Sequence, residues 1–251
     1  MLIRNLSHLP LLALLLNVST LSAQTLFWAD LAGRIQKSGT DGAPITTILR
    51  SEAPEDLLTS PDGQTLYWSE SGNNGIWKYA AGTPAPVKIY QAPETVRGLA
   101  LDQDNLYFVQ PAGIYRMKTD GSLPVVALAV SGANDICLIG GLLYWTGLQD
   151  GKIYKQNGLT GTAIFSSLSF PTNLLYNATD DRLYWLEYCG ASTCSGIRKG
   201  KTDGTGKQIV VDEFISGFAL DSAGATLYCT YDIYDEVFTI STTGTGRTSV
   251  A

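Results

Sequence analysis

One short pattern, a leucine followed by one or two aromatic residues, recurs six times and constrains the fold more than any other feature of the chain. The copies lie 40, 40, 37, 40 and 44 residues apart, and four of the five tryptophans occupy the third position. A repeat of this length is typical of proteins built from several copies of one small structural unit. The copies begin at Leu26, Leu66, Leu106, Leu143, Leu183 and Leu227.

Each repeat predicts four short β-strands. A polar loop follows the aromatic strand and leads to a second strand of the form Ile-x-Lys or Ile-x-Arg, as at 76–78. Asp-Gly turns such as 119–121 come next, where glycine supplies a positive φ. A third strand, as at 125–128, and a fourth, as at 97–102, complete the unit, and no window shows a helical period. The sequence therefore predicts an all-β fold, a single six-bladed β-propeller of four-stranded antiparallel blades.

The strand count is short by one in the first repeat. Only five strands of the Gly-Leu-Ala-Leu-Asp type precede an aromatic strand, because the first aromatic strand begins directly after Gln24. The first blade therefore either lacks its innermost strand or uses residues near 17–23 to form it. An open sheet edge is a template for pairing with another chain, so one hypothesis is a structural protein of an envelope assembly that accepts a partner's strand there.

The first 23 residues predict a secretory signal peptide. Arg4 precedes an apolar run at 9–18, and the small residues of 19–23 lead into Gln24, which is the layout of a cleaved leader. The run is too short to span a bilayer comfortably, and no later apolar run is long enough. We therefore expect residues 24–251 to form a propeller that is secreted or periplasmic and does not insert into a membrane.

Charge and histidine content exclude several classes of function. The chain has 17 basic and 23 acidic residues, a net charge of −6, and loss of Arg4 with the leader makes this −7. An acidic chain without a cluster of Lys and Arg is not expected to bind nucleic acid. The only histidine, His8, lies in the leader, so the mature chain cannot form a Ser-His-Asp triad or a His-ligated zinc site.

The four cysteines fall into two kinds. Cys189 and Cys194 flank a short loop-like segment and are predicted to form a disulfide, which suits an exported protein. Cys137 and Cys229 lie in apolar, strand-like runs, and we expect them to be small buried hydrophobic residues.

The loops of a propeller lie on two faces, because successive strands of a blade alternate in direction. The loop after the aromatic strand and the loop that leads into the innermost strand share one face, which we call the open face, and the Asp-Gly turns lie on the other. The open-face loops are longer and more varied, so we predict that they bind a partner. The candidate binding residues are Ser71, Asn73, Asn74, Asp150, Tyr188, Tyr231, Asp232, Tyr234 and Asp235.

The loop at 231–236 is the least ordinary of these. It combines tyrosines with acidic residues, and tyrosine offers a large contact area at low cost in conformational entropy. It could bind a basic peptide or a glycan. The alternative is a solvated acidic loop whose tyrosines fold onto the rim.

A second candidate set is expected at the mouth of the central channel. Carboxylate and amide oxygens there could hold Ca²⁺, and propeller lactonases as a class use a metal in this position. Arg97 in the same ring opposes a cation, and the alternative is a set of groups that bind water and cap strand ends. We therefore predict no metal and no cofactor. The set comprises Asp56, Arg97, Asn134, Asp135 and Asn173, with Thr172 and Ser216 beside them.

Acidic residues in the fifth position of three repeats suggest structural charge pairs. Asp30, Glu70 and Glu187 lie on aromatic strands, and the strands that follow carry Lys37, Lys78 and Lys199. Opposite charges on adjacent strands stabilise a sheet by roughly 0.2–1 kcal/mol. We predict that each acidic residue pairs with the lysine of its own repeat.

The copies resemble the YWTD repeats of the low-density-lipoprotein-receptor class B family. The segments that carry the resemblance are Leu-Tyr-Trp-Ser-Glu at 66–70, Leu-Tyr-Trp-Thr at 143–146 and Gly-Leu-Ala-Leu-Asp at 98–102. The resemblance covers essentially the whole mature chain and implies a six-bladed propeller that binds a partner.

Two functions follow from these patterns. The first is an exported, non-catalytic module that recognises a protein or a glycan through the open face. The second is a Ca²⁺-dependent, lactonase-like hydrolase that uses the oxygen ligands of the channel mouth.

Overall fold

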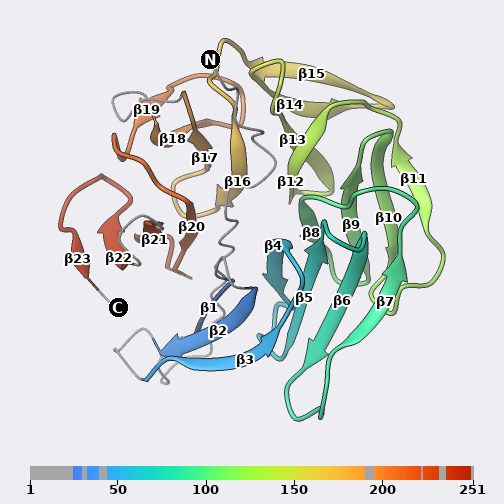
Figure 1. The fold of residues 1–251 in the computed structure, drawn as a ribbon. Coiled ribbons are helices and arrows are strands. Elements are labelled where there is room, and N and C mark those ends of the chain that lie inside the picture. Colours follow the sequence, from blue (N-terminus) through green and yellow to red (C-terminus); the bar gives the residue numbers. More distant parts are fainter. Residues whose placement is uncertain are drawn as a thin grey trace, which may run out of the picture.

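The computed structural model describes residues 25–29, 33–39, 44–189, 195–221, 223–231 and 236–249. These residues form 23 β-strands and no helix, arranged as six antiparallel sheets around a central channel (Figure 1). The prediction of an all-β, six-bladed propeller is confirmed. We name the sheets blades A to F in chain order. No helix in these ranges is long and apolar enough to cross a membrane.

Blades B to F each have four strands, which follow one another from the channel outward in chain order. Their bounds are β4 (Pro54–Thr59), β5 (Thr65–Glu70), β6 (Gly75–Ala80) and β7 (Val87–Gln91) in blade B; β8 (Leu99–Leu101), β9 (Asn105–Gln110), β10 (Gly113–Lys118) and β11 (Val125–Leu128) in blade C; β12 (Ala133–Ile139), β13 (Leu142–Gly147), β14 (Lys152–Asn157) and β15 (Thr160–Phe165) in blade D; β16 (Thr172–Asn177), β17 (Arg182–Glu187), β18 (Gly196–Lys201) and β19 (Gln208–Ile209) in blade E; and β20 (Gly217–Leu220), β21 (Thr226–Tyr231), β22 (Glu236–Ser241) and β23 (Thr248–Ser249) in blade F.

Blade A has three strands within the described residues, β1 (Thr25–Ala29), β2 (Arg34–Gly39) and β3 (Thr46–Arg50). β1 carries the aromatic motif, so the position without a strand is the innermost one, as the sequence predicted. Residues 17–23, the alternative source of that strand, lie outside the described residues. Whether they complete the blade stays a prediction.

The two aromatic residues of each repeat serve opposite faces of the blade. Trp68 is 1% exposed and stacks on Trp77 of the next strand, with ring centroids 6.1 Å apart. Its neighbour Tyr67 lies directly opposite Lys78, whose Nζ is 5.6 Å from the centre of the tyrosine ring. Blades D and E repeat the second contact with Tyr144 and Lys155 and with Tyr184 and Lys199. The lysine of the Ile-x-Lys motif therefore forms a cation–π contact with the motif tyrosine.

This arrangement corrects the predicted charge pairs. Glu70 lies opposite Gly75 at the end of the strand pair, whereas Lys78 lies three residues further along, opposite Tyr67. In blade E, Glu187 pairs with Lys207 at 2.6 Å, and Lys199 pairs with Asp180 at 3.4 Å. The prediction was wrong because it counted repeat positions without the strand register. Asp30 lies outside the described residues.

The acidic residues instead anchor the loops that lead into their own blades. Glu70 is 2% exposed and accepts hydrogen bonds from Trp68 Nε1 at 3.3 Å and from the backbone N–H of Glu52 at 3.2 Å. Glu187 accepts from Trp185 Nε1 at 2.9 Å and from the backbone N–H of Ser169 at 3.4 Å. The acidic position is thus structural, and it joins the buried tryptophan to an open-face loop.

Three glycine turns on the opposite face join neighbouring blades. Gly121, Gly204 and Gly244 have φ values of +90°, +87° and +83°. A Cβ at these positions would lie within 2.3 Å of a carbonyl oxygen on an outer segment of the preceding blade. Glycine is therefore required both for the turn and for the close approach between blades.

The ring closes between blades F and A by side-chain packing. Leu26 and Trp28 of β1 form a buried cluster with Ala219, Tyr228 and Val237 of blade F. Within the described ranges no sheet combines strands from the two ends of the chain. In the described part of the chain, the contact between blades F and A is therefore apolar packing without a shared sheet.

Candidate functional site

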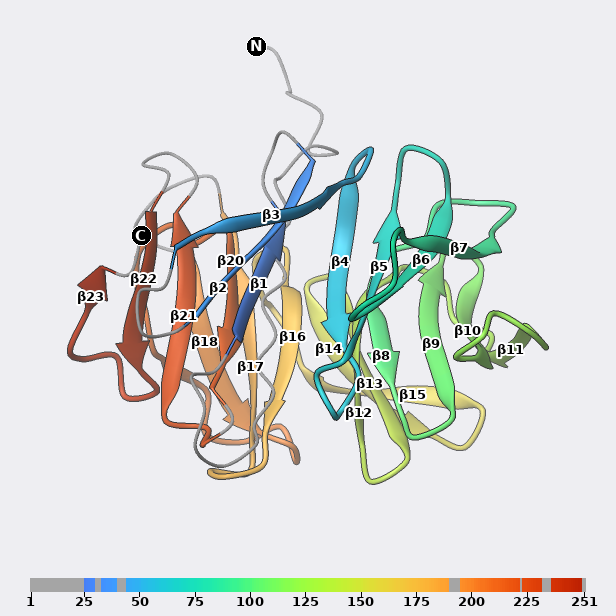
Figure 2. The ribbon, with the colours of Figure 1, turned by 90° about the horizontal axis from the view of Figure 1, so that it is seen from below.

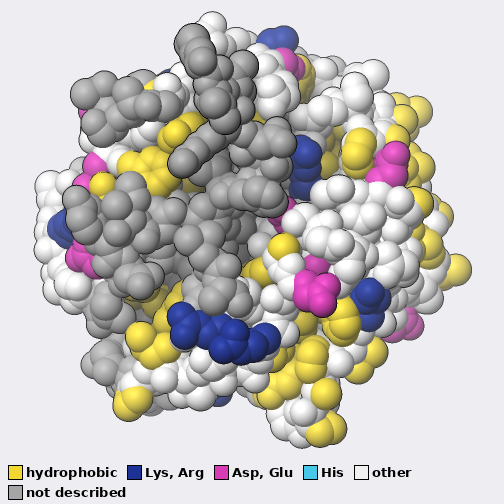
Figure 3. Space-filling model, in the orientation of Figure 1, with side chains coloured by type: hydrophobic (Ala, Val, Ile, Leu, Met, Phe, Trp, Pro, Cys, Tyr) yellow, Lys and Arg dark blue, Asp and Glu magenta, His cyan; other side chains and the backbone are white. Residues whose placement is uncertain are grey.

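The loops sort onto two faces as the sequence predicted. The backbone N–H of Ser71, after β5, donates to the carbonyl of Ala53, just before β4, at 3.1 Å. The N–H of Tyr188, after β17, donates to the carbonyl of Ser169, before β16, at 2.8 Å. Figure 2 shows the loops that flank β4 and β5 together at the top of the ring. Figure 3 views this open face directly.

Four predicted binding residues make contacts within their own blades. The side chain of Asn73 donates to Glu70, and Asn74 has a φ of +53° while its carbonyl accepts from Ala92 N–H at 2.9 Å. Ser71 contributes the backbone bond described above. Asp150 accepts a hydrogen bond from the Tyr154 hydroxyl. Its carboxyl group packs so closely on Gly147 that a Cβ at that glycine would lie 2.1 Å from Asp150 Oδ1. These residues shape the loops, and a contact with a partner stays a prediction for them.

Two other predicted residues, Tyr188 and Tyr231, come together through a third aromatic ring. Phe214, in the loop before β20, makes an edge-on contact with Tyr188 at 5.7 Å between centroids and lies 6.1 Å from Tyr231. All three residues are partly exposed. We call them the aromatic cluster. Asp232, Tyr234 and Asp235 lie outside the described residues.

Ion pairs balance the acidic residues beside the aromatic cluster. Arg247 bonds to Glu213 at 2.8 Å and to Glu236 at 2.7 Å. Arg198 bonds to Asp212 at 2.9 Å. Asp212 and Glu213 directly precede Phe214 in the chain, and Glu236 lies opposite Tyr231 in the sheet. The described border of the cluster is therefore ion-paired, with three acidic and two basic side chains around an apolar centre.

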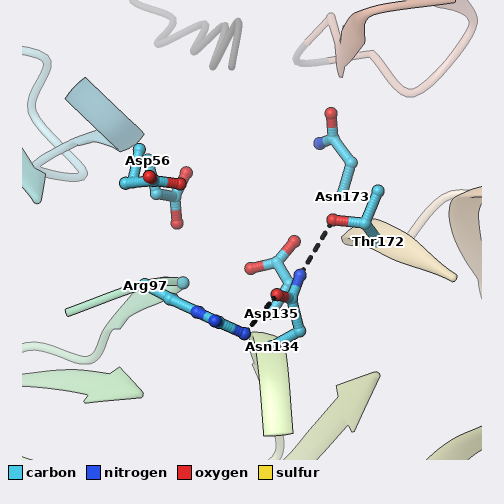
Figure 4. Close-up of a pocket in the computed structure, with 8 residues that line it drawn as sticks. Asp56, Arg97, Asn134, Asp135, Thr172 and Asn173 are labelled. Atoms are coloured by element: carbon cyan, nitrogen blue, oxygen red, sulfur yellow. Dashed lines mark hydrogen bonds between the residues drawn. The ribbon is translucent and has the colours of Figure 1, made fainter. Parts of the chain in front are cut away.

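The residues predicted at the channel mouth do lie together (Figure 4). All five, with Glu55, Gly98 and Thr172, line a pocket of about 30 Å³. Arg97 donates to Asn134 Oδ1 at 3.2 Å, and Asn134 Nδ2 donates to Thr172 Oγ1 at 3.0 Å. These bonds link blades C, D and E. Ser216, which the sequence placed beside this set, is not among the residues that line the pocket.

The acidic residues of the mouth clasp one blade to the next. Asp56 Oδ2 accepts from Leu99 N–H and Asp135 Oδ2 accepts from Leu174 N–H, both at 2.6 Å. Asn173 repeats the contact with the backbone of Phe218, accepting at 3.3 Å and donating at 3.4 Å. We call these three contacts the inter-blade clasps.

Gly98 explains why blade C has no such clasp. A Cβ on Gly98 would lie 2.4 Å from Asp135 Oδ1, so blade D comes too close for a side chain. The Gly98 N–H instead donates to the carbonyl of Asn134 at 3.1 Å. Each of the four junctions from blade B to blade F is thus tied by a hydrogen bond at the mouth.

The two carboxyl groups of the mouth hold their protons more tightly than usual. Burial raises the pKa of Asp135 to about 6. Burial, and next the charge of Asp135, raise the pKa of Asp56 well above its usual range. Both acids are only partly buried, and their mutual repulsion keeps a proton on one of them to a higher pH than usual.

The mouth does not fit a resident metal ion in this arrangement. Within the described residues no three His, Cys, Asp or Glu side chains are grouped as metal ligands would be. All four carboxylate oxygens of Asp56 and Asp135 already accept a backbone N–H. Asn134 Oδ1 is held by Arg97, whose positive charge lies in the same ring. A hard cation takes about six to eight oxygen ligands, more than the remaining lone pairs of these four oxygens supply.

Below the mouth, the innermost strands enclose a cavity of about 270 Å³. Its lining comes from β4, β8, β12, β16 and β20 and shares Asp56, Asp135 and Asn173 with the mouth. Apart from these three residues the lining is predominantly apolar. The channel is therefore polar at its mouth and apolar in its body.

The cysteines agree in part with the prediction. Cys189 is disulfide-bonded, and its predicted partner Cys194 lies outside the described residues. Cys137 and Cys229 are free thiols, and burial raises the pKa of both. Cys229 is buried in the core as expected, whereas Cys137 is only partly buried because it lines the channel cavity.

Comparisons with solved structures find similar propellers at low sequence identity. A chain of a nidogen–laminin complex has a TM-score of 0.75 and 17% identity over 89% of this chain and 90% of that chain. A gluconolactonase from Xanthomonas campestris has a TM-score of 0.67 and 18% identity over 88% and 84%. A chain of a mitotic checkpoint complex has a TM-score of 0.63 and 14% identity over 92% and 90%. No model of a known protein family matches the chain. At such identities the likeness shows the fold alone.

Proposed function

We propose that this chain is a non-catalytic module that binds a protein through its open face. The observation that carries the proposal is the aromatic cluster of Tyr188, Phe214 and Tyr231, which joins blades E and F on that face. Partly exposed aromatic residues inside an ion-paired border have the anatomy of a binding hot spot. A glycan could also stack on these rings, but the paired charges around them favour a protein surface.

Two similar propellers support a protein partner. The nidogen–laminin complex and the mitotic checkpoint complex are both assemblies of several proteins. The YWTD-like repeats are consistent with a distant relationship to receptor propellers that bind proteins. We also propose that the chain is exported after removal of residues 1–23, and an N-terminal sequence of the exported protein that starts elsewhere than Gln24 would contradict this cleavage.

The aromatic cluster can be tested with a matched pair of variants. One carries Tyr188→Ala and Tyr231→Ala, and the control carries Tyr115→Ala, which removes a half-buried tyrosine with one ring contact on blade C. Partners are captured from the exported fraction of the native host, identified, and titrated in purified form. Loss of two hot-spot residues should weaken binding at least a hundredfold, whereas the control should bind normally. A partner that binds both variants equally would remove the cluster from the interface.

A lactonase-like hydrolase is the second candidate. The observation that favours it is the pair of partly buried carboxyl groups, Asp56 and Asp135, that line the pocket in the channel mouth and have raised pKa values. The likeness to a gluconolactonase supports the same candidate. Because the mouth does not fit a metal in this arrangement, the hydrolase would have to free carboxylate oxygens when Ca²⁺ binds.

Thermal unfolding in Ca²⁺ and in chelator separates the two candidates. A ligand at about one hundred times its dissociation constant stabilises the folded state by roughly 2.7 kcal/mol. Coincident unfolding curves, together with no hydrolysis of simple lactones, would exclude the Ca²⁺-dependent hydrolase. A shift in unfolding temperature that Asp56→Asn and Asp135→Asn abolish would support it.

A further inference from the structure

The innermost strands of the described blades present apolar side chains to the channel. Leu101, Leu138 and Leu175 lie on the innermost strands of three successive blades, and all three line the cavity while remaining partly exposed. Apolar side chains at the centre of a domain are normally packed against other atoms. These leucines pack against the core clusters on one side and on the other line a space of about 270 Å³, which is larger than the roughly 150 Å³ apolar cavity that is sufficient to bind benzene.

The mouth offers a second, much smaller space of different character. Its volume of about 30 Å³ is close to that of one water molecule, and a primary ammonium group is of similar size. Asp56, Asp135 and Asn173 line both spaces, so a group in the mouth would sit directly above the apolar body of the channel.

The charges at the mouth favour a cation over an anion. The pocket is lined by three acidic side chains, those of Glu55, Asp56 and Asp135, and by one basic side chain, that of Arg97. The guanidinium of Arg97 donates to Asn134 Oδ1, whereas the carboxylates of Asp56 and Asp135 each hold two backbone N–H groups and keep further lone pairs. An ammonium group carries three donors and one positive charge, which complements these acceptors.

We propose that the channel binds a small amphiphile, with a primary ammonium group in the mouth between Asp56 and Asp135 and an apolar tail among the leucines of the innermost strands. This site is separate from the aromatic cluster and does not depend on the proposed protein partner. A single amphiphile would account for both the polar mouth and the mainly apolar body of the channel. A metal ion would fill only the first.

The test is a homologous series of ligands titrated by calorimetry at pH 7.5, below their critical micelle concentrations. The series comprises n-alkylamines from butyl to decyl, with 1-alkanols and n-alkanoates of equal length as controls. Each added methylene that enters the cavity should tighten binding about fourfold. The gain should stop when the tail fills the cavity. Amines should bind more tightly than alkanols, and alkanoates should not bind.

Two substitutions test separately the site for the ammonium group in the mouth, called the head site, and the site for the apolar tail among the leucines, called the tail site. Asp135→Asn should reduce amine binding to the level of the alkanol and leave the alkanol unchanged. Leu138→Trp should fill the cavity and abolish binding of both. Leu142→Trp is the matched control, because Leu142 lies on the adjacent strand of the same hairpin and is 40% exposed at the surface. Near-ultraviolet circular dichroism checks that each variant is folded, and Asp56→Asn replaces Asp135→Asn if the latter is not.

Several outcomes would overturn the proposal. Equal affinity for amines, alkanols and alkanoates would remove the head site. Affinity that keeps rising with chain length, or that survives Leu138→Trp, would place the ligand on the outer surface. An absence of binding for every member of the series would show that the channel is not a ligand site of this class.

Discussion

Blades D and E differ from blade A in how they are held in the ring. Where D meets E, Asp135 clasps the backbone of Leu174 across the junction, and buried Tyr144 and Trp185 pack in one shared apolar cluster. At the two junctions of blade A, no clasp is formed by the described residues, and contact rests on side chains such as Trp28 and Ala29. Among the described residues, blade A also has one strand fewer on the side of the channel.

The difference teaches that a ring of similar units need not be uniformly stable. A clasp adds a side-chain hydrogen bond that is fixed in direction, from a carboxyl group at Asp56 and Asp135 and from an amide at Asn173, whereas apolar packing alone is non-directional. Blade A should therefore open before the others, as a locally unstable unit of an otherwise cooperative domain.

The largest expected effect comes from removing the same motif tryptophan in the two regions. Trp185 is fully buried in blade E, and Trp185→Ala should lower the free energy of unfolding of the whole domain by about 3–5 kcal/mol. Trp28→Ala should act mainly on blade A, because that blade can detach. Chemical denaturation measures the first effect, and hydrogen exchange of β1 to β3 against β16 to β19 measures the second. Equal global destabilisation by both variants would contradict a weakly held blade A.

A smaller effect is expected from cutting one clasp. Asp135→Ala leaves the backbone N–H groups of Ile136 and Leu174 without their acceptor, and a buried unpaired donor costs about 1–3 kcal/mol. The D–E junction should then exchange amide hydrogens as fast as the junctions of blade A. Asp150→Ala is the control, since Asp150 lies on the same blade but bonds only to side chains. Unchanged exchange at the D–E junction would show that packing alone holds it.

The smallest effect is a dependence of stability on pH. Burial raises the folded-state pKa of Asp135 to about 6, above its ordinary value of 3.8. The group therefore favours the folded state fully below pH 3.8, and this contribution is lost as pH rises through about 6. The free energy of unfolding, measured by denaturant titration, should be about 1 kcal/mol higher at pH 5 than at pH 7. The Asp56→Asn, Asp135→Asn double variant should lose that difference, and a difference that persists in it would come from other groups.

The repeat made the architecture predictable because every blade places the same Leu-aromatic motif on the same strand. Position within the repeat also placed Asp56, Asp135 and Asn173 at the channel mouth, since equivalent residues of a ring meet at its centre. The register of the strands was not predictable from spacing alone, so Lys78 and Lys199 were paired with the wrong partners. Their contact with a motif tyrosine depends on which residues lie directly opposite each other.

The aromatic cluster was only partly visible in the sequence. Tyr188 and Tyr231 stand at the ends of aromatic strands and were selected for that reason. Phe214 lies between two strands without any repeat position of its own, and only the packing of blade E against blade F brings it between the tyrosines. The apolar channel was missed because the leucines of the innermost strands read as ordinary core residues. Their partial exposure follows from the width of the ring.

In the described part of the chain, each blade is formed by one continuous segment. No sheet there contains a strand from the opposite end of the chain. Duplication or deletion of one segment of about forty residues would therefore add or remove a complete sheet without splitting another. A gene of this kind can change the number of its units in one recombination step. After such a change, the packing of Leu26 and Trp28 against the last blade would have to be re-established, because this contact closes the ring.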